Sequence, residues 1–145
     1  MKVSTRFSVA IHILVMMNVK KDTMLTSDQL AQSVNTNPVV IRRILGMLKT
    51  AGFVDTKRGV GGSFLIKDAQ DITLLDIFKA VGCVNSGSMF EIHQDTNQDC
   101  KVGANIQNIV LKNVDKAQSA MEKELSNVTI ADITSDLLKE IKTQQ

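Results

Sequence analysis

Residues 25–66 read LTSDQLAQSVNTNPVVIRRILGMLKTAGFVDTKRGVGGSFLI, and this stretch decides the fold. Its first polar letters, TSDQ, have the spacing of a capping box, so Thr26 marks a helix start. A short helix and the turn NTN follow, after which Asn37 caps a second helix and Pro38 takes the first helical position. Gly52 is the expected end of that helix. The stretch therefore predicts two helices joined by a tight turn.

The segment after Gly52 predicts a β-hairpin. FVDTK and SFLIK read as two short strands, and RGVGG between them supplies glycines for positive φ angles. Lys57 and Arg58 stand at the mouth of this glycine run. The order of helix, short helix, turn, capped helix and hairpin predicts a winged helix-turn-helix, a mainly α fold with a small β-hairpin wing.

Helical periodicity also predicts structure outside this stretch. A first helix is expected over residues 4–18, with one apolar stripe made of Phe7, Ala10, Ile11, Leu14 and Val15. Further capping boxes begin at Thr73 and Thr129, which we interpret as shared helix-start chemistry and not as a sequence repeat. Residues 102–125 predict a helix about 33 Å long with apolar residues at spacings of three and four. Such a rod must bury its stripe against the body or against another subunit.

These elements suggest three parts. Residues 1–81 are predicted to form the winged helix-turn-helix DNA-binding domain, and the irregular residues 82–101 an effector or sensor loop. Residues 102–145 are predicted to form dimerisation helices, with the long helix making the contact and a C-terminal helix over 129–142 crossing to the partner. The hypothesis is a homodimer.

Charge and composition narrow the class of partner. Residues 1–68 hold ten Lys/Arg against four Asp/Glu, a net charge of +6, whereas residues 69–145 hold seven against eleven, a net charge of −4. Only the first part is therefore expected to face a polyanion. With five Phe and neither Trp nor Tyr, stacking platforms for single strands are disfavoured, so the expected partner is double-stranded DNA. No apolar run approaches the roughly 20 residues of a membrane span, and two cysteines without an export signal indicate a cytoplasmic protein.

The predicted fold assigns candidate DNA contacts. The second helix of the motif, residues 37–51, is expected in the major groove and the wing, residues 57–62, in the minor groove. Arg42 and Arg43 can each fork onto guanine or clamp a phosphate, and Lys49 is expected to meet a phosphate. The full candidate set is Thr26, Ser27, Asn35, Thr36, Asn37, Val39, Arg42, Arg43, Lys49, Lys57, Arg58, Gly59 and Gly61.

LAQSVNTNPVVIRRILGMLKTAGFV, RGVGG, ITLLDIFKAV and NQDCKVGANI together resemble the Rrf-two (Rrf2) family of bacterial transcriptional regulators. The resemblance covers nearly the whole chain and is most specific from AGFV to FLI. It implies a homodimeric DNA-binding repressor or activator whose long helix dimerises and whose wing arginine, here Arg58, probes the minor groove. Well-known members bind an iron–sulfur cluster through three closely spaced cysteines before the long helix. This chain has only Cys83 and Cys100, so the resemblance implies the cluster-free branch.

The two cysteines allow more than one interpretation. Both are candidates for a redox role, and Cys83 also fits a small buried hydrophobe after an apolar helix end. A metal site would have to draw on Cys83, His93, Asp95, Asp99 and Cys100, whose spacings match no zinc pattern. We therefore predict no cofactor and no metal.

An enzyme is not expected, because the RGVGG glycines precede a strand, whereas a nucleotide-binding loop precedes a helix. The main prediction is a sequence-specific transcription regulator of the repressor type, acting as a homodimer on a roughly palindromic operator. The alternative is a redox or small-molecule sensor that acts mainly through protein partners. An unknown small-molecule or redox effector is compatible with either.

Overall fold

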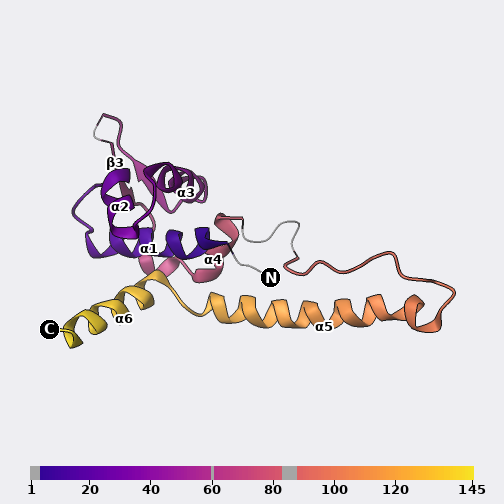
Figure 1. Cartoon of the computed structure of the whole chain (residues 1–145). Helices are drawn as coiled ribbons and strands as arrows, with labels where there is room; N and C mark the ends of the chain where they lie inside the picture. The colour runs from indigo at the N-terminus through magenta and orange to yellow at the C-terminus, as the bar shows by residue number, and fades with distance from the viewer. Residues whose placement is uncertain (1–3, 60, 83–87) are drawn as a thin grey trace.

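The computed structural model of the protein describes residues 4–59, 61–82 and 88–145. Figure 1 shows a body formed by the N-terminal elements and a long helix that extends to one side of it. The elements are α1 (Thr5–Val19), β1 (Leu25–Thr26), α2 (Ser27–Val34), α3 (Pro38–Thr50), β2 (Val54–Thr56), β3 (Gly62–Leu65), the short 3₁₀ helix η1 (Ala69–Asp71), α4 (Leu74–Ala80), α5 (Lys101–Ser126) and α6 (Ile130–Thr143). The predicted order of the winged helix-turn-helix is confirmed.

Helix α1 is the centre of the core. It packs against α2, α3 and α4 and also against α6, so it is covered on more than one side. The predicted stripe is therefore too narrow. Phe7 and Ile11 are only half-buried, whereas Ile13 and Met17, which lie outside the stripe, are buried. A single apolar stripe describes a helix on a surface, and α1 is enclosed.

The helix-turn-helix forms as its capping residues predict. The Thr26 side chain accepts from the Gln29 N–H, and the Gln29 side chain accepts from the Thr26 N–H. Asn35 ends α2 in the left-handed region, at φ 60°. Asn37 Oδ1 accepts from the Val39 N–H at 2.8 Å and begins α3. The core-facing residues of the two helices are buried as expected: Leu30, Ala31, Ile41, Ile44, Leu45 and Leu48.

The wing belongs to a three-stranded antiparallel sheet in the order β1-β3-β2. The hairpin β2–β3 was predicted and β1 was not, because a two-residue strand is too short to show alternation. Gly62 pairs with Thr26 across β1 and β3. A Cβ at Gly62 would lie 2.6 Å from the Cβ of Met24, so the close approach of the two strands needs this glycine.

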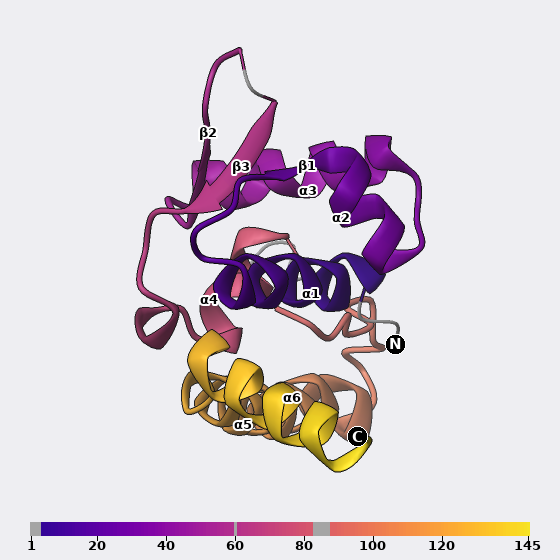
Figure 2. The ribbon, with the colours of Figure 1, turned by 90° about the vertical axis from the view of Figure 1, so that its left-hand side faces the viewer.

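Helix α6 returns to the body and lies along α1, as Figures 1 and 2 both show. The buried Asn18 of α1 donates through Nδ2 to the buried Thr134 Oγ1 at 2.9 Å. The Thr134 hydroxyl in turn donates to the carbonyl of Ile130 at 2.7 Å. This buried polar link joins α6 to α1, and Asn18 Oδ1 has no hydrogen-bond partner among the described residues.

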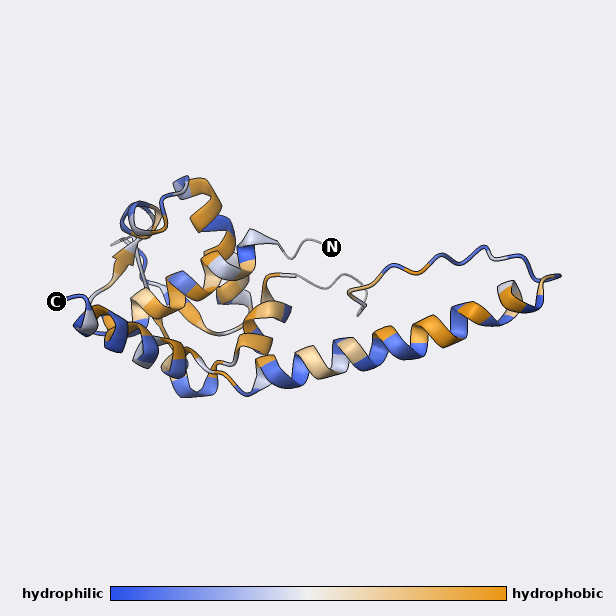
Figure 3. Ribbon diagram, turned by 60° about the horizontal axis from the view of Figure 1, so that its bottom comes forward, coloured by the Kyte–Doolittle hydropathy of each residue, from blue (hydrophilic) through white to orange (hydrophobic). Residues whose placement is uncertain are grey.

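Helix α5 has no buried residue. Figure 3 shows apolar residues recurring along its length. Val102, Ile106 and Ile109 are 68%, 41% and 54% exposed. At its first turn, the Thr96 hydroxyl donates to the carbonyl of Gly103 at 2.6 Å, so residues 95–100 are tied to the helix start. Among the described helices, none has the length and apolar character needed to cross a membrane.

Candidate nucleic-acid interface

Helix α3 has one buried face and one exposed basic face. Its buried residues anchor it in the core, while Val39, Arg42 and Arg43 are exposed. These three positions are spaced by three and four residues and therefore lie on one stripe of the helix. The exposed stripe of α3 thus begins with an apolar residue and carries Arg42 and Arg43 one turn later.

The wing projects from the sheet on the same end of the molecule as α3, away from α5 and α6 (Figure 2). Lys57 and Arg58 are exposed on it. Gly59 and Gly61 have φ angles of +86° and +69°, backbone conformations that residues other than glycine rarely adopt. Residues 56–59 and Gly61 are exposed to solvent beside α3, whereas Gly62 and Ser63 are buried in β3.

A cleft of about 420 Å³ separates α3 from the wing. Seven of the predicted contact residues line it: Ser27, Arg42, Lys49, Lys57, Arg58, Gly59 and Gly61. Neither Arg42 nor Arg58 forms an ion pair with an acidic residue in the described part of the chain. The cleft therefore gathers cations that are available to an anionic ligand.

Arg43 differs from Arg42 in its surroundings. It lines a separate hollow with Met47, Thr50 and Ala80, on the side of α3 that faces α4. The other predicted residues outside the cleft lie at the helix-turn-helix caps and turn or on the first turn of α3: Thr26, Asn35, Thr36, Asn37 and Val39. The side-chain oxygens of Thr26 and Asn37 each accept a hydrogen bond from a backbone N–H of the helix that they cap.

Lys49 is held by two residues of β2. Its Nζ lies 3.3 Å from Asp55 Oδ1 and donates to Thr56 Oγ1 at 3.2 Å. The pKa of Asp55 is lowered, first by the N–H of Thr56 and then by Lys49. Sequence reasoning missed Asp55, although an acidic residue in a basic wing is a signal of such a pair. Lys49 thus connects α3 to β2.

Comparisons with known proteins decide the family. Residues 3–136 match the model of the Rrf2 family, described as "Iron-dependent Transcriptional regulator". The Bacillus subtilis protein named "Putative HTH-type transcriptional regulator YwnA" is 38% identical over 135 residues, which cover 93% of this chain and 98% of that protein. The chain belongs to the Rrf2 family of transcriptional regulators.

Solved structures agree with the fold of an Rrf2 regulator. A crystal structure titled "putative DNA binding protein" is 38% identical, has a TM-score of 0.70, and the match covers 88% of this chain and 97% of that one. A "putative transcriptional regulator" from Lactobacillus plantarum is 26% identical, has a TM-score of 0.77, and the match covers 97% and 99%. Because the family and these relatives are regulators, the expectation that the protein is not an enzyme is confirmed.

The iron in the family description calls for side chains that would hold it. The chain has two cysteines, whereas an iron–sulfur cluster is most often held by four cysteine thiolates, so the cysteines of one chain do not complete such a set. Within the described ranges, no three His, Cys, Asp or Glu side chains gather as a metal site. Cys83 lies outside the described residues. His93 Nε2 lies within hydrogen-bond distance of the carbonyl oxygen of Asp95, at 3.1 Å.

Cys100 is exposed at the N-cap of α5. The pKa of its thiol is lowered by the backbone N–H of Gly103 and, to a smaller extent, by that of Val102. A thiolate at a helix N-terminus is a better nucleophile than an ordinary thiol. The redox role of Cys100 stays a prediction.

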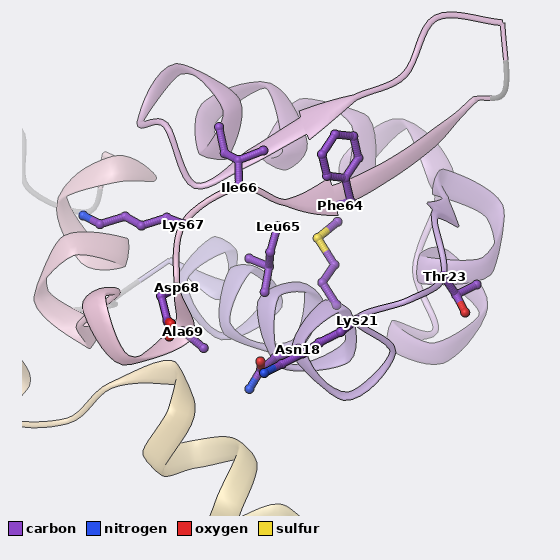
Figure 4. Close-up of a pocket in the computed structure, with 10 residues that line it drawn as sticks. Asn18, Lys21, Thr23, Phe64, Leu65, Ile66, Lys67, Asp68 and Ala69 are labelled. Carbon is purple, nitrogen blue, oxygen red and sulfur yellow. The ribbon is translucent and has the colours of Figure 1, made fainter.

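A further cavity of about 330 Å³ lies between the end of α1 and the β3 side of the sheet (Figure 4). Leu65 points from the strand toward α1, and Lys67 points away, with its Nζ 5.5 Å from the centre of the Phe53 ring. Thr23 and Asp68 also line the cavity. The small-molecule effector stays a prediction. This cavity is one candidate binding site for it.

Proposed function

We propose that this Rrf2 regulator binds double-stranded DNA with α3 in the major groove and the wing in the minor groove. One observation carries the proposal: Arg42 of α3 and Arg58 of the wing line the same open cleft. A narrow minor groove concentrates negative potential and attracts arginine, while a major groove admits a helix. Regulators of the Rrf2 family bind DNA.

The proposed binding unit is a homodimer joined through α5. This helix leaves Val102, Ile106 and Ile109 exposed along one side, and a second copy of the same stripe is the natural cover for it. Twofold symmetry then requires a roughly palindromic operator, with half-sites one or two helical turns apart, about 34 Å per turn.

We further propose that the protein represses transcription in the bacterial cytoplasm without an iron–sulfur cluster. A dimer that covers one or two turns of duplex excludes other proteins from it, which favours repression. The two-cysteine donor set supports cluster-free action. The alternative, a sensor that works mainly through protein partners, would need no DNA-facing cleft, and no observation on the described residues favours it.

Selection of genomic DNA fragments with purified protein tests the proposal. We expect enrichment of one palindromic sequence, and a reporter driven from it should be lowered by the protein. Arg58→Ala should weaken binding to that sequence by about 1–3 kcal/mol, because it removes a specific groove contact. Lys142→Ala, which removes an equal charge from exposed α6, is the matched control. A selection that enriches no sequence would reject DNA-based regulation in favour of partner docking.

A further inference from the structure

Two valines stand in solvent on the first turn of α3. Val39 is 54% exposed and Val40 is 36% exposed, whereas α3 buries Ile41 and Ile44 completely. Single exposed apolar residues are common on protein surfaces. Their position is what calls for an explanation here, since the first turn of a recognition helix is the part that meets base edges.

Val39 and Val40 face different stripes of α3. Val39 lies three and four residues before Arg42 and Arg43, so it shares the exposed basic stripe. Val40 lies four residues before the buried Ile44, so it leans toward the core. Val39 is therefore the valine that a duplex in front of α3 would meet.

A valine side chain carries neither a donor nor an acceptor, so it cannot read the polar pattern of a base pair. The apolar group on the base edges of the major groove is the C5 methyl of thymine. A valine pressed against a polar edge would leave that edge without its hydrogen-bond partner, which is unfavourable. Contact with thymine buries two apolar surfaces together instead.

We propose that Val39 determines specificity by contacting the C5 methyl of one thymine in each half-site. This inference rests on the proposed DNA binding by α3. It adds that an A·T pair, oriented with its thymine toward the first turn of α3, is part of the recognition sequence. Arg42, one turn further along, is left to contact guanine or phosphate.

The test replaces each thymine of the selected operator in turn by deoxyuridine, which keeps every hydrogen-bonding group and lacks only the methyl. With the wild-type protein, one thymine per half-site should be sensitive, and its replacement should weaken binding about fourfold, the factor that corresponds to burial of one methyl group. Val39→Ala keeps only the Cβ methyl, so with this variant the sensitivity at that position should become smaller. Val40→Ala, the matched control, should keep it.

The outcomes separate this inference from the proposed function. If the operator binds but no uracil replacement matters, or if the sensitivity is undiminished in Val39→Ala, the Val39 contact is wrong and DNA binding stands. If no operator is enriched at all, the proposed function itself fails. Val39 is more than half exposed, so circular dichroism and urea unfolding of Val39→Ala should match the wild type and remove misfolding as an explanation.

Discussion

Thr73 and Thr129 face each other across an isolated antiparallel bridge, and each is the N-cap of a helix. The Leu74 N–H donates to the carbonyl of Val128, and the Ile130 N–H donates to the carbonyl of Ile72, both at 2.9 Å. The starts of α4 and α6 are therefore joined, and the junction between α5 and α6 is fixed to the body at this point.

Thr129→Ala should destabilise the protein by about 1 kcal/mol, because it removes the side chain that accepts from the Asp132 N–H in the capping box. Thr129→Ser keeps the hydroxyl and should retain most of the stability. Urea unfolding at one fixed protein concentration measures the difference. Thr143→Ala, in the last turn of α6, is the control and should change little. Equal losses in Thr129→Ala and Thr143→Ala would show that the Thr129 cap does not stabilise the start of α6.

Two glycines should respond in opposite directions to alanine. Gly62→Ala should destabilise by about 1–3 kcal/mol, because the new Cβ meets Met24 across the β1–β3 pair. Gly46→Ala, in the interior of α3 with open space around it, should stabilise by about 0.5–1 kcal/mol through the higher helix propensity of alanine. Chemical unfolding of both variants checks the pair. A neutral Gly62→Ala would mean that β1 and β3 are not in close contact.

Local chemistry explains which parts of the fold the sequence could predict. Four helix starts, at Thr26, Asn37, Thr73 and Thr129, were predictable because a helix cap depends only on residues within three or four positions of it. The wing was predictable from its glycines. The residues of the candidate cleft followed from these two elements, since the turn and the hairpin bring them together.

The parts that the sequence did not predict depend on contacts between distant residues. Asn18 is buried because α6, more than a hundred residues later, packs on α1 and brings Thr134 within hydrogen-bond distance. The two-residue strand β1 exists because β3 pairs with it. Asp55 holds Lys49 only once β2 lies beside α3. Periodicity within one segment carries no information about such partners.

Asp55→Asn should make DNA binding more sensitive to salt. Lys49 is held 3.3 Å from Asp55, and loss of the carboxylate frees it to neutralise one more phosphate. The slope of log K against log salt should therefore steepen by about 0.9. Asp136→Asn, on α6, is the control with the same charge change. An unchanged slope would show that Lys49 already contacts DNA in the wild type or does not face it.

The same pair sets a pH dependence. Because the pKa of Asp55 is lowered in the folded protein, its pairing with Lys49 contributes to stability above the ordinary aspartate pKa. The contribution is lost as pH falls through the lowered value. The difference in unfolding free energy between the wild type and Asp55→Asn should therefore be present at neutral pH and shrink as pH falls through the lowered pKa of Asp55, which urea unfolding at several pH values measures.

Ile106→Glu should convert the proposed dimer into monomers. Ile106 is 41% exposed on α5, and a carboxylate at that place would be buried without a partner in the interface. Asn108→Glu places the same charge on the opposite side of the helix and should leave the dimer intact. Sedimentation at micromolar concentration distinguishes the two. A wild-type protein that is already monomeric under these conditions would exclude dimerisation through α5.

Cys100 should be alkylated faster at low pH than an ordinary cysteine. The N–H groups of Gly103 and Val102 stabilise its thiolate, so its pKa is lowered in the folded protein. In a Cys83→Ser background it is the single thiol, and the pH–rate profile with iodoacetamide can be assigned to it. The midpoint should lie at lower pH for the folded protein than for the same chain in denaturant, where the helix start is lost. Coincident midpoints would contradict stabilisation of the thiolate. If alkylation leaves operator affinity unchanged, the redox role fails while the reactivity of the thiol stands.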